Sequence, residues 1–90
     1  MPNEIIRVDG TREPYPPANG RDYTLAELKK AIGGGFIEIA HTQDGRIMVI
    51  DDEGKLKGFP VNPVATALYV YGEQDPIVGD VLVCQDGNIE

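Results

Sequence analysis

The clearest alternation of apolar and polar positions lies in the middle of the chain. Two β-rich stretches, "FIEIA" at 36–40 and "RIMVI" at 46–50, are joined by "HTQDG". Asp44-Gly45 in that connection is a turn dipeptide, and β-rich stretches on both sides of such a dipeptide predict an antiparallel hairpin. "EIIRV" near the start and a stretch near 80–84 have the composition of two further strands.

A helix is predicted from about 25 to 32, in "YTLAELKKAIGGG". Its apolar residues recur at helical spacing and share one face: Leu25, Leu28 and Ile32. Thr24 as N-cap and Glu27 three residues later form a capping box. Gly33 then offers the left-handed residue that commonly ends a helix.

A second helix is predicted from 63 to 71, in "FPVNPVATALYVYG". Asn62 is a good N-cap, and Pro63 at the first helical position loses no hydrogen bond. Three residues share a face: Val64, Leu68 and Tyr71. Because no charged residue lies between Pro63 and Gly72, we expect this helix to be mostly buried.

The element order β-α-β-β-α-β predicts an α+β fold in which an antiparallel β-sheet of four to five strands is covered by two short helices. The split βαβ of ferredoxin-like folds uses this order. A short additional strand is possible in "KLKGFPV". The 90 residues are expected to form a single domain, with 9–22 as a long surface loop because it is rich in Pro and Gly.

The chain carries fifteen acidic and eight basic residues, a formal net charge of −7. This charge disfavours binding to a phosphate backbone, so no direct nucleic-acid contact is expected. It permits an acidic surface that occupies a basic site on another protein, although simple solubility explains it equally well. No apolar run is long enough for a bilayer, the start lacks a secretory signal, and the single Cys84 suits a reducing compartment. A cytoplasmic protein without membrane contact is expected.

Motifs for catalysis are weak throughout the chain. The sequence contains no serine and one histidine, His41, and Cys84 lies in a predicted core strand. A nucleophile with an adjacent base is therefore not supported. "DDEGKLKG" does not match the ligand spacing of a calcium-binding loop, and "IGGGF" runs from helix to strand, the reverse of a P-loop. No catalytic residue, metal or cofactor is expected, and the chain is not predicted to be an enzyme.

Several residues could contact a ligand, each with a structural alternative. Glu38 is expected to share a strand face with Phe36 and Ala40 and is either a ligand contact or an exposed edge carboxylate. Arg46, Lys55 and Lys57 could cluster around a small anion or lie as scattered surface charges. The long loop contains Arg12 and Tyr15.

Three phrases of the sequence, "YTLAELKKAIGGGFIEIA", "GRIMVIDDEGKLKGFPVNPVATALY" and "DPIVGDVLV", resemble a small phage and mobile-element family, the domain of unknown function number 3846. The resemblance covers Tyr23 to Cys84 and departs from the family pattern at the third glycine of 33–35 and at Asp52. It carries over no catalytic residue. Asn62, Pro63 and Tyr69 resemble recurring family positions, which implies a helix entrance that faces a ligand or a second subunit; capping and packing are the alternative.

A small, acidic phage protein without catalytic groups suggests two functions. The first is a counter-defence protein that sequesters a nucleotide-derived immune signal of the infected bacterial host without cleaving it. Stacking by Tyr15 or Tyr69 and anion contacts from Arg12 or Arg46 would hold that ligand. The alternative is a nucleic-acid mimic that inhibits a host nuclease or CRISPR effector, or else a non-enzymatic phage accessory protein. A homo-oligomer is expected, because Tyr69 and Val70 point away from the predicted core face of their helix.

Overall fold

The computed structural model describes residues 3–89. Its helices and strands follow the chain in this order: β1 (Glu4–Ile6), β2 (Arg12–Pro14), α1 (Leu25–Ile32), β3 (Ile37–His41), β4 (Ile47–Asp51), α2 (Pro63–Leu68), β5 (Val81–Cys84) and the 3₁₀ helix η1 (Asp86–Asn88). Within these residues the strands form one five-stranded sheet with the order β2-β1-β5-β4-β3. Every neighbouring pair is antiparallel, so the predicted α+β class is confirmed.

The predicted hairpin is confirmed as β3 and β4. Ile37 pairs with Asp51 and His41 pairs with Ile47. The connecting turn contains Gly45, whose φ of 86° lies in the left-handed region that glycine adopts without a steric penalty. Because β4 pairs with β5 on its other side, β3 is left as one edge of the sheet.

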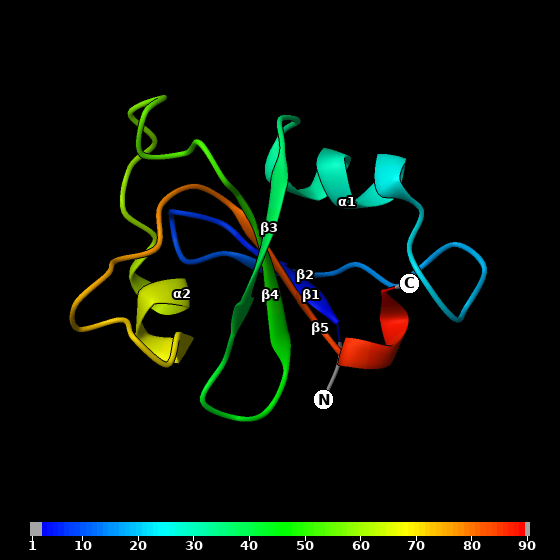
Figure 1. Ribbon diagram of the computed structural model, residues 1–90. Coiled ribbons are helices and arrows are strands. Elements are labelled where there is room, and N and C mark those ends of the chain that lie inside the picture. Colours follow the sequence, from blue (N-terminus) through cyan, green and yellow to red (C-terminus); the bar gives the residue numbers. More distant parts are fainter. Residues whose placement is uncertain (1–2, 90) are drawn as a thin grey trace.

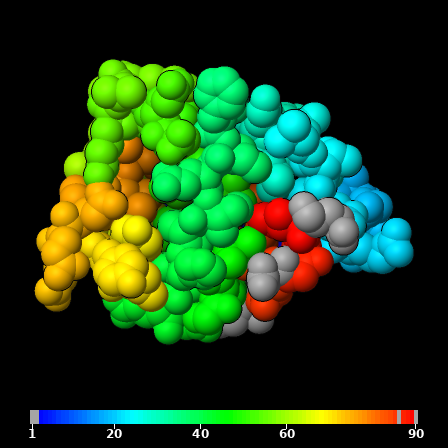
Figure 2. Space-filling view, in the orientation of Figure 1, coloured from blue at the N-terminus to red at the C-terminus, as the bar shows by residue number. Residues whose placement is uncertain are grey.

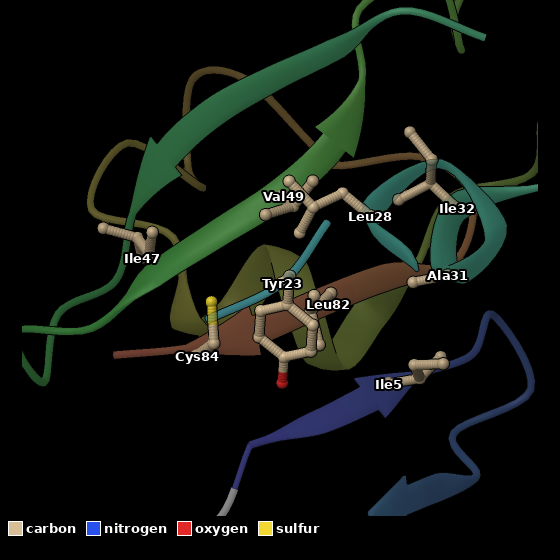
Figure 3. Packing of buried hydrophobic residues seen from close by; sticks show 9 residues of the cluster. All are labelled: Ile5, Tyr23, Leu28, Ala31, Ile32, Ile47, Val49, Leu82 and Cys84. Atoms are coloured by element: carbon tan, nitrogen blue, oxygen red, sulfur yellow. The ribbon is translucent and has the colours of Figure 1, made fainter. Parts of the chain in front are cut away.

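The two helices cover opposite faces of the sheet, as Figure 1 shows. One core lies under α1 and includes Leu28, Val49 and Leu82 (Figure 3). The other lies under α2 and includes Met48 and Val83. Side chains alternate between the faces of a strand, so β4 and β5 contribute to both cores. The ferredoxin-like arrangement considered from the element order is not adopted, because no neighbouring strands in the described sheet are parallel.

Helix α1 begins and ends where its capping residues predict. The Thr24 hydroxyl accepts a hydrogen bond from the backbone of Glu27, and the Glu27 carboxylate accepts one from the backbone of Thr24. Gly33 closes the helix with a φ of 87°. The buried face differs slightly from the prediction, because Leu25 in the first turn is 57% exposed and Ala31 is buried.

Helix α2 starts as predicted but ends at Leu68, three residues earlier than expected. The chain leaves the helix there to pair with the end of β3: Gln43 donates to the carbonyl of Leu68 at 2.8 Å, and Val70 donates to that of His41 at 3.1 Å. The prediction of a mostly buried helix is wrong. Ala65 is fully buried, but other residues of the helix are half-buried or exposed, and Tyr71 beyond it is 62% exposed.

Two segments between the main elements differ from their predictions. The stretch 9–22, expected to be a surface loop, contains β2, which pairs with β1 and forms the other edge of the sheet. The possible strand in 55–61 is instead mostly turns, with a single bridge from Val61 to Val78. Hydrophobic periodicity did not indicate β2, because this strand has only three residues and includes Pro14.

Candidate functional site

A polar cleft of about 120 Å³ lies beside β3 on the face covered by α2. It is formed by Glu38 of β3, the turn after β4 and the segment before β5. Four acidic residues line it: Glu38, Asp51, Asp52 and Asp75. Lys55 also lines the cleft, and Ile77 contributes to its wall. We call this the acidic cleft; Figure 2 shows a recess between β3, the turn after β4 and the orange segment around residue 75.

Backbone pairing positions the first two carboxylates. Glu38 lies opposite Ile50 in the ladder, so its side chain emerges on the α2 face of the sheet edge. Asp52 follows β4 directly, and its backbone N–H donates to the carbonyl of Phe36 at 2.8 Å. The two side chains therefore meet at the open end of the hairpin, where β3 begins and β4 ends.

The third carboxylate comes from the loop after α2. The backbone N–H of Asp75 donates to the carbonyl of Tyr71 at 2.9 Å, which closes a turn within this loop. The Asp75 carboxylate forms an ion pair with Lys55. Lys55 thus faces Glu38, Asp52 and Asp75, whereas the Asp51 carboxylate pairs with Lys57, and the local charge remains negative.

The environment of the acidic cleft shifts the pKa of Glu38. Burial raises the pKa of its carboxyl group above the usual 4.5, and the nearby charge of Asp52, a hydrogen bond with Asp52 and the charge of Asp75 raise it further. Lys55 acts in the opposite direction. The pKa of Tyr69 is raised by burial first, and then by Asp75 and Glu38. A cation in the cleft would reduce this carboxylate repulsion.

A second and larger hollow of about 590 Å³ lies on the other side of Tyr69. Its lining includes the amide side chains of Gln43 and Gln74, together with Thr66 and the acidic Glu73. The Tyr69 ring packs edge to face against Tyr71, with 5.8 Å between ring centroids. Within the described residues no lysine or arginine lines this hollow. It offers an aromatic ring and amides but no cation for a phosphate.

The two arginines predicted to hold an anion both contact carboxylates. The guanidinium of Arg12 binds Glu4 through two hydrogen bonds of 3.0 and 2.7 Å. Arg46 is buried and its Nη2 lies 2.6 Å from Asp44. Arg12 also lies on β2, at the opposite edge of the sheet from β3.

Of the two alternatives for Arg46, Lys55 and Lys57, the cluster around an anion does not form. Lys55 pairs with Asp75, and Lys57 lies 2.7 Å from the Asp51 carboxylate. Because β4 is extended, Arg46 before it lies a full strand length from the two lysines after it. These side chains are separate ion pairs.

Tyr15 and Asn62 are used inside the domain. The Tyr15 hydroxyl donates to the carbonyl of Glu27 at 2.8 Å, and its ring stacks on Tyr23 with a centroid distance of 5.8 Å. Asn62 is fully buried; its Nδ2 donates to the carbonyls of Ile6 and Gly79, both at 2.9 Å, and its Oδ1 accepts from Ala65.

Of the six predicted contacts, Arg12 and Arg46 meet at one carboxylate, that of Glu4. The charge of Glu38 contributes to the raised pKa of Tyr69. Ligand binding by all six residues, and the assembly of copies through Tyr69 and Val70, stay predictions. Sequence reasoning missed the partnership of Asp52 and Asp75 with Glu38. No spacing rule links residues from a strand, a turn and a distant loop, so only the fold reveals it.

Chemical groups for catalysis do not converge in the described part of the chain. Cys84 is fully buried, while His41 is exposed on β3. Between residues 3 and 89, no group of three histidine, cysteine or carboxylate side chains is placed to hold a metal ion. No helix among these residues has the length and apolar character needed to cross a bilayer.

The fold and the site define a small α+β domain with an acidic cleft at one sheet edge. The chain belongs to the family described as domain of unknown function (DUF3846), whose model matches residues 3–90. No curated protein and no solved structure matches this chain.

Proposed function

We propose that this chain is a non-enzymatic binding protein whose acidic cleft receives a basic segment of a partner protein. The observation that carries the proposal is the convergence of Glu38, Asp52 and Asp75 around a single lysine. The raised pKa of Glu38 supports it, because a cationic group in the cleft would stabilise carboxylates that now repel one another.

The distribution of the other charges favours the same partner. Within the described residues, five basic side chains form ion pairs with carboxylates: Arg7, Arg12, Arg46, Lys55 and Lys57. A chain of net charge −7 therefore presents few cations that are not already paired. Complementary charge would speed association with a basic protein and oppose association with nucleic acid.

The family resemblance supplies the biological setting of the proposal. In a phage-infected bacterium, the partner would be a host defence protein with a basic groove, such as a nuclease or a CRISPR effector. The chain would act in the host cytoplasm and would inhibit by covering that groove. If the chain is instead a phage accessory protein, it would bind a different basic partner through the same cleft.

Sequestration of a nucleotide-derived immune signal is the second candidate function. The hollow beside Tyr69 favours it, since the ring can stack on a base and Gln43 and Gln74 can hydrogen-bond its edge. It has less support than the first, because the hollow's charged lining residue is Glu73 and both predicted arginines contact carboxylates elsewhere.

The test is a fluorescence-anisotropy titration of a labelled octalysine peptide. The double variant Glu38→Gln/Asp52→Asn removes two charges from the cleft. Its matched control, Ala18→Lys/Ala26→Lys, changes the net charge equally, from −7 to −5, at two exposed positions before and within α1. We expect the cleft variant to weaken binding about tenfold more than the control. Charges close to the peptide contribute more to the binding free energy than distant charges, which salt screens.

Equal weakening by the two variants would contradict binding in the acidic cleft and indicate only a general acidic field.

In parallel, the protein is incubated with cyclic dinucleotides and then heated to release them. Recovery of an intact nucleotide would favour the second candidate function, and its absence together with selective octalysine binding would favour the first.

A further inference from the structure

We propose that the edge of β3 binds an extended peptide as an additional strand, and that this peptide alternates basic and apolar side chains. The inference rests on the proposed function and specifies the partner segment that the acidic cleft receives. Strand addition at a sheet edge combines main-chain hydrogen bonds with side-chain contacts on alternate residues.

The backbone of β3 offers an open edge between Phe36 and His41. In an antiparallel ladder, alternate residues bond to the neighbouring strand. Asp52 donates to Phe36 and Thr42 donates to Arg46, so the even-numbered residues of β3 bond to β4. The N–H and C=O groups of Ile37 and Ile39 therefore point away from the sheet, and none has a hydrogen-bond partner within the described residues.

The far end of this edge is already covered. Val70 donates to the carbonyl of His41, and Gln43 donates to that of Leu68, so the segment after α2 occupies that position. The open edge is thus confined to Ile37 and Ile39, next to the acidic cleft. A docked strand would run directly past Glu38.

The two sides of the open edge differ in chemistry. On the α2 face stand Glu38 and, beyond it, Asp52 and Asp75. On the α1 face, Ile39 is 41% exposed. Phe36, predicted to share the face of Glu38, precedes β3; it is 66% exposed and its ring lies 5.9 Å from the Lys29 ammonium of α1. Successive side chains of a docked strand point to opposite faces. One set would meet carboxylates and the other would meet apolar groups, which requires the alternating pattern.

A second copy of this chain fits the edge less well. In the antiparallel register that pairs Ile37 with Ile39 of the other copy, Glu38 stands opposite Glu38, and like charges directly opposite destabilise a strand pair. The net charge of −7 on each copy adds repulsion. The opposite sheet edge, β2, contains Pro14, a residue that protects edges from further pairing.

The experiment compares two labelled peptides of equal composition on the intact chain. One alternates valine and lysine over eight residues, and the other carries four valines followed by four lysines. We expect the alternating peptide to bind about tenfold more tightly, because only it places lysines and valines on the correct faces while forming the backbone bonds.

Two variants separate backbone pairing from side-chain contact. Ile39→Pro removes an outward N–H and leaves the bonds to β4 unchanged, whereas Ile39→Ala trims the side chain and keeps the N–H. We expect Ile39→Pro to abolish the preference for the alternating peptide and Ile39→Ala to retain most of it. Amide hydrogen exchange at Ile37 and Ile39 of the unaltered chain should also slow on binding, which provides a test even if the proline variant does not fold.

The outcomes distinguish this inference from the proposed function. Equal binding of the two peptides with unchanged exchange at Ile37 and Ile39 would overturn strand addition and leave the acidic cleft as a simple cation site. Failure of both peptides to bind would overturn both. Tighter binding of the alternating peptide with protection of these two amides would support both.

Discussion

Asn62 shows how a single buried side chain connects distant parts of the chain. Its amide donates to Ile6 of β1 and to Gly79 before β5, while its oxygen caps α2 through Ala65. Both of its N–H donors and its oxygen are thus used in holding α2 against the sheet. The resemblance of Asn62 to a recurring family position is consistent with this structural role.

Substitution of Asn62 by alanine should therefore destabilise the domain strongly. The change removes a helix cap and leaves two buried carbonyls without a donor, so we expect a loss of about 2–4 kcal/mol in the free energy of unfolding. Thr24→Ala, which removes an exposed cap on α1, is the comparison and should cost about 1 kcal/mol. Urea denaturation measures the free energy of unfolding of both variants. A loss for Asn62→Ala as small as that for Thr24→Ala would show that the Asn62 contacts are not cooperative.

At the scale of the elements, the entry into β3 depends on close packing at Gly35. Its φ is +89°, and an added Cβ would lie 2.6 Å from the Lys57 ammonium and 2.8 Å from the Asp51 carboxylate. Glycine thus allows the chain to pass an ion pair that joins the end of β4 to the turn beside the acidic cleft.

Gly35→Ala should destabilise the hairpin more than Gly45→Ala does. Both positions have a left-handed φ, and that strain alone costs about 1–3 kcal/mol. At Gly45, however, no atom beyond the adjacent residues lies within 4 Å of the added Cβ, whereas at Gly35 the side chains of the Asp51–Lys57 pair must shift. Thermal unfolding followed by circular dichroism compares the two variants, and equal midpoints would argue that the ion pair moves without cost.

Local signals in the sequence predicted the elements well. The capping box of Thr24, the Asn62-Pro63 start and the Asp44-Gly45 turn each use contacts within a few residues, so the sequence contains them. The early end of α2 could not be predicted in this way. It results from pairing between Val70 and His41, which are far apart in the chain.

At the scale of the whole molecule, the order of the strands determines the site. Because β3 lies at one edge and β2 at the other, Glu38 and Arg12 are separated, although each was predicted as a ligand contact. The helices lie on opposite faces, which brings the loop after α2, with Asp75, to the α2 face of β3. Local patterns do not encode strand order, and for this reason the acidic cleft emerged from the fold alone.

The most direct measurement is the carboxyl pKa of Glu38, obtained by carbon-13 NMR of the free protein and of the protein saturated with octalysine. Burial and the neighbouring carboxylates should raise the free value above 4.5. A bound cation favours the ionised form, so octalysine should lower this pKa, and by linkage its affinity should fall as the pH decreases through the free value. A Glu38 pKa that octalysine leaves unchanged, while the peptide binds, would contradict binding in the acidic cleft.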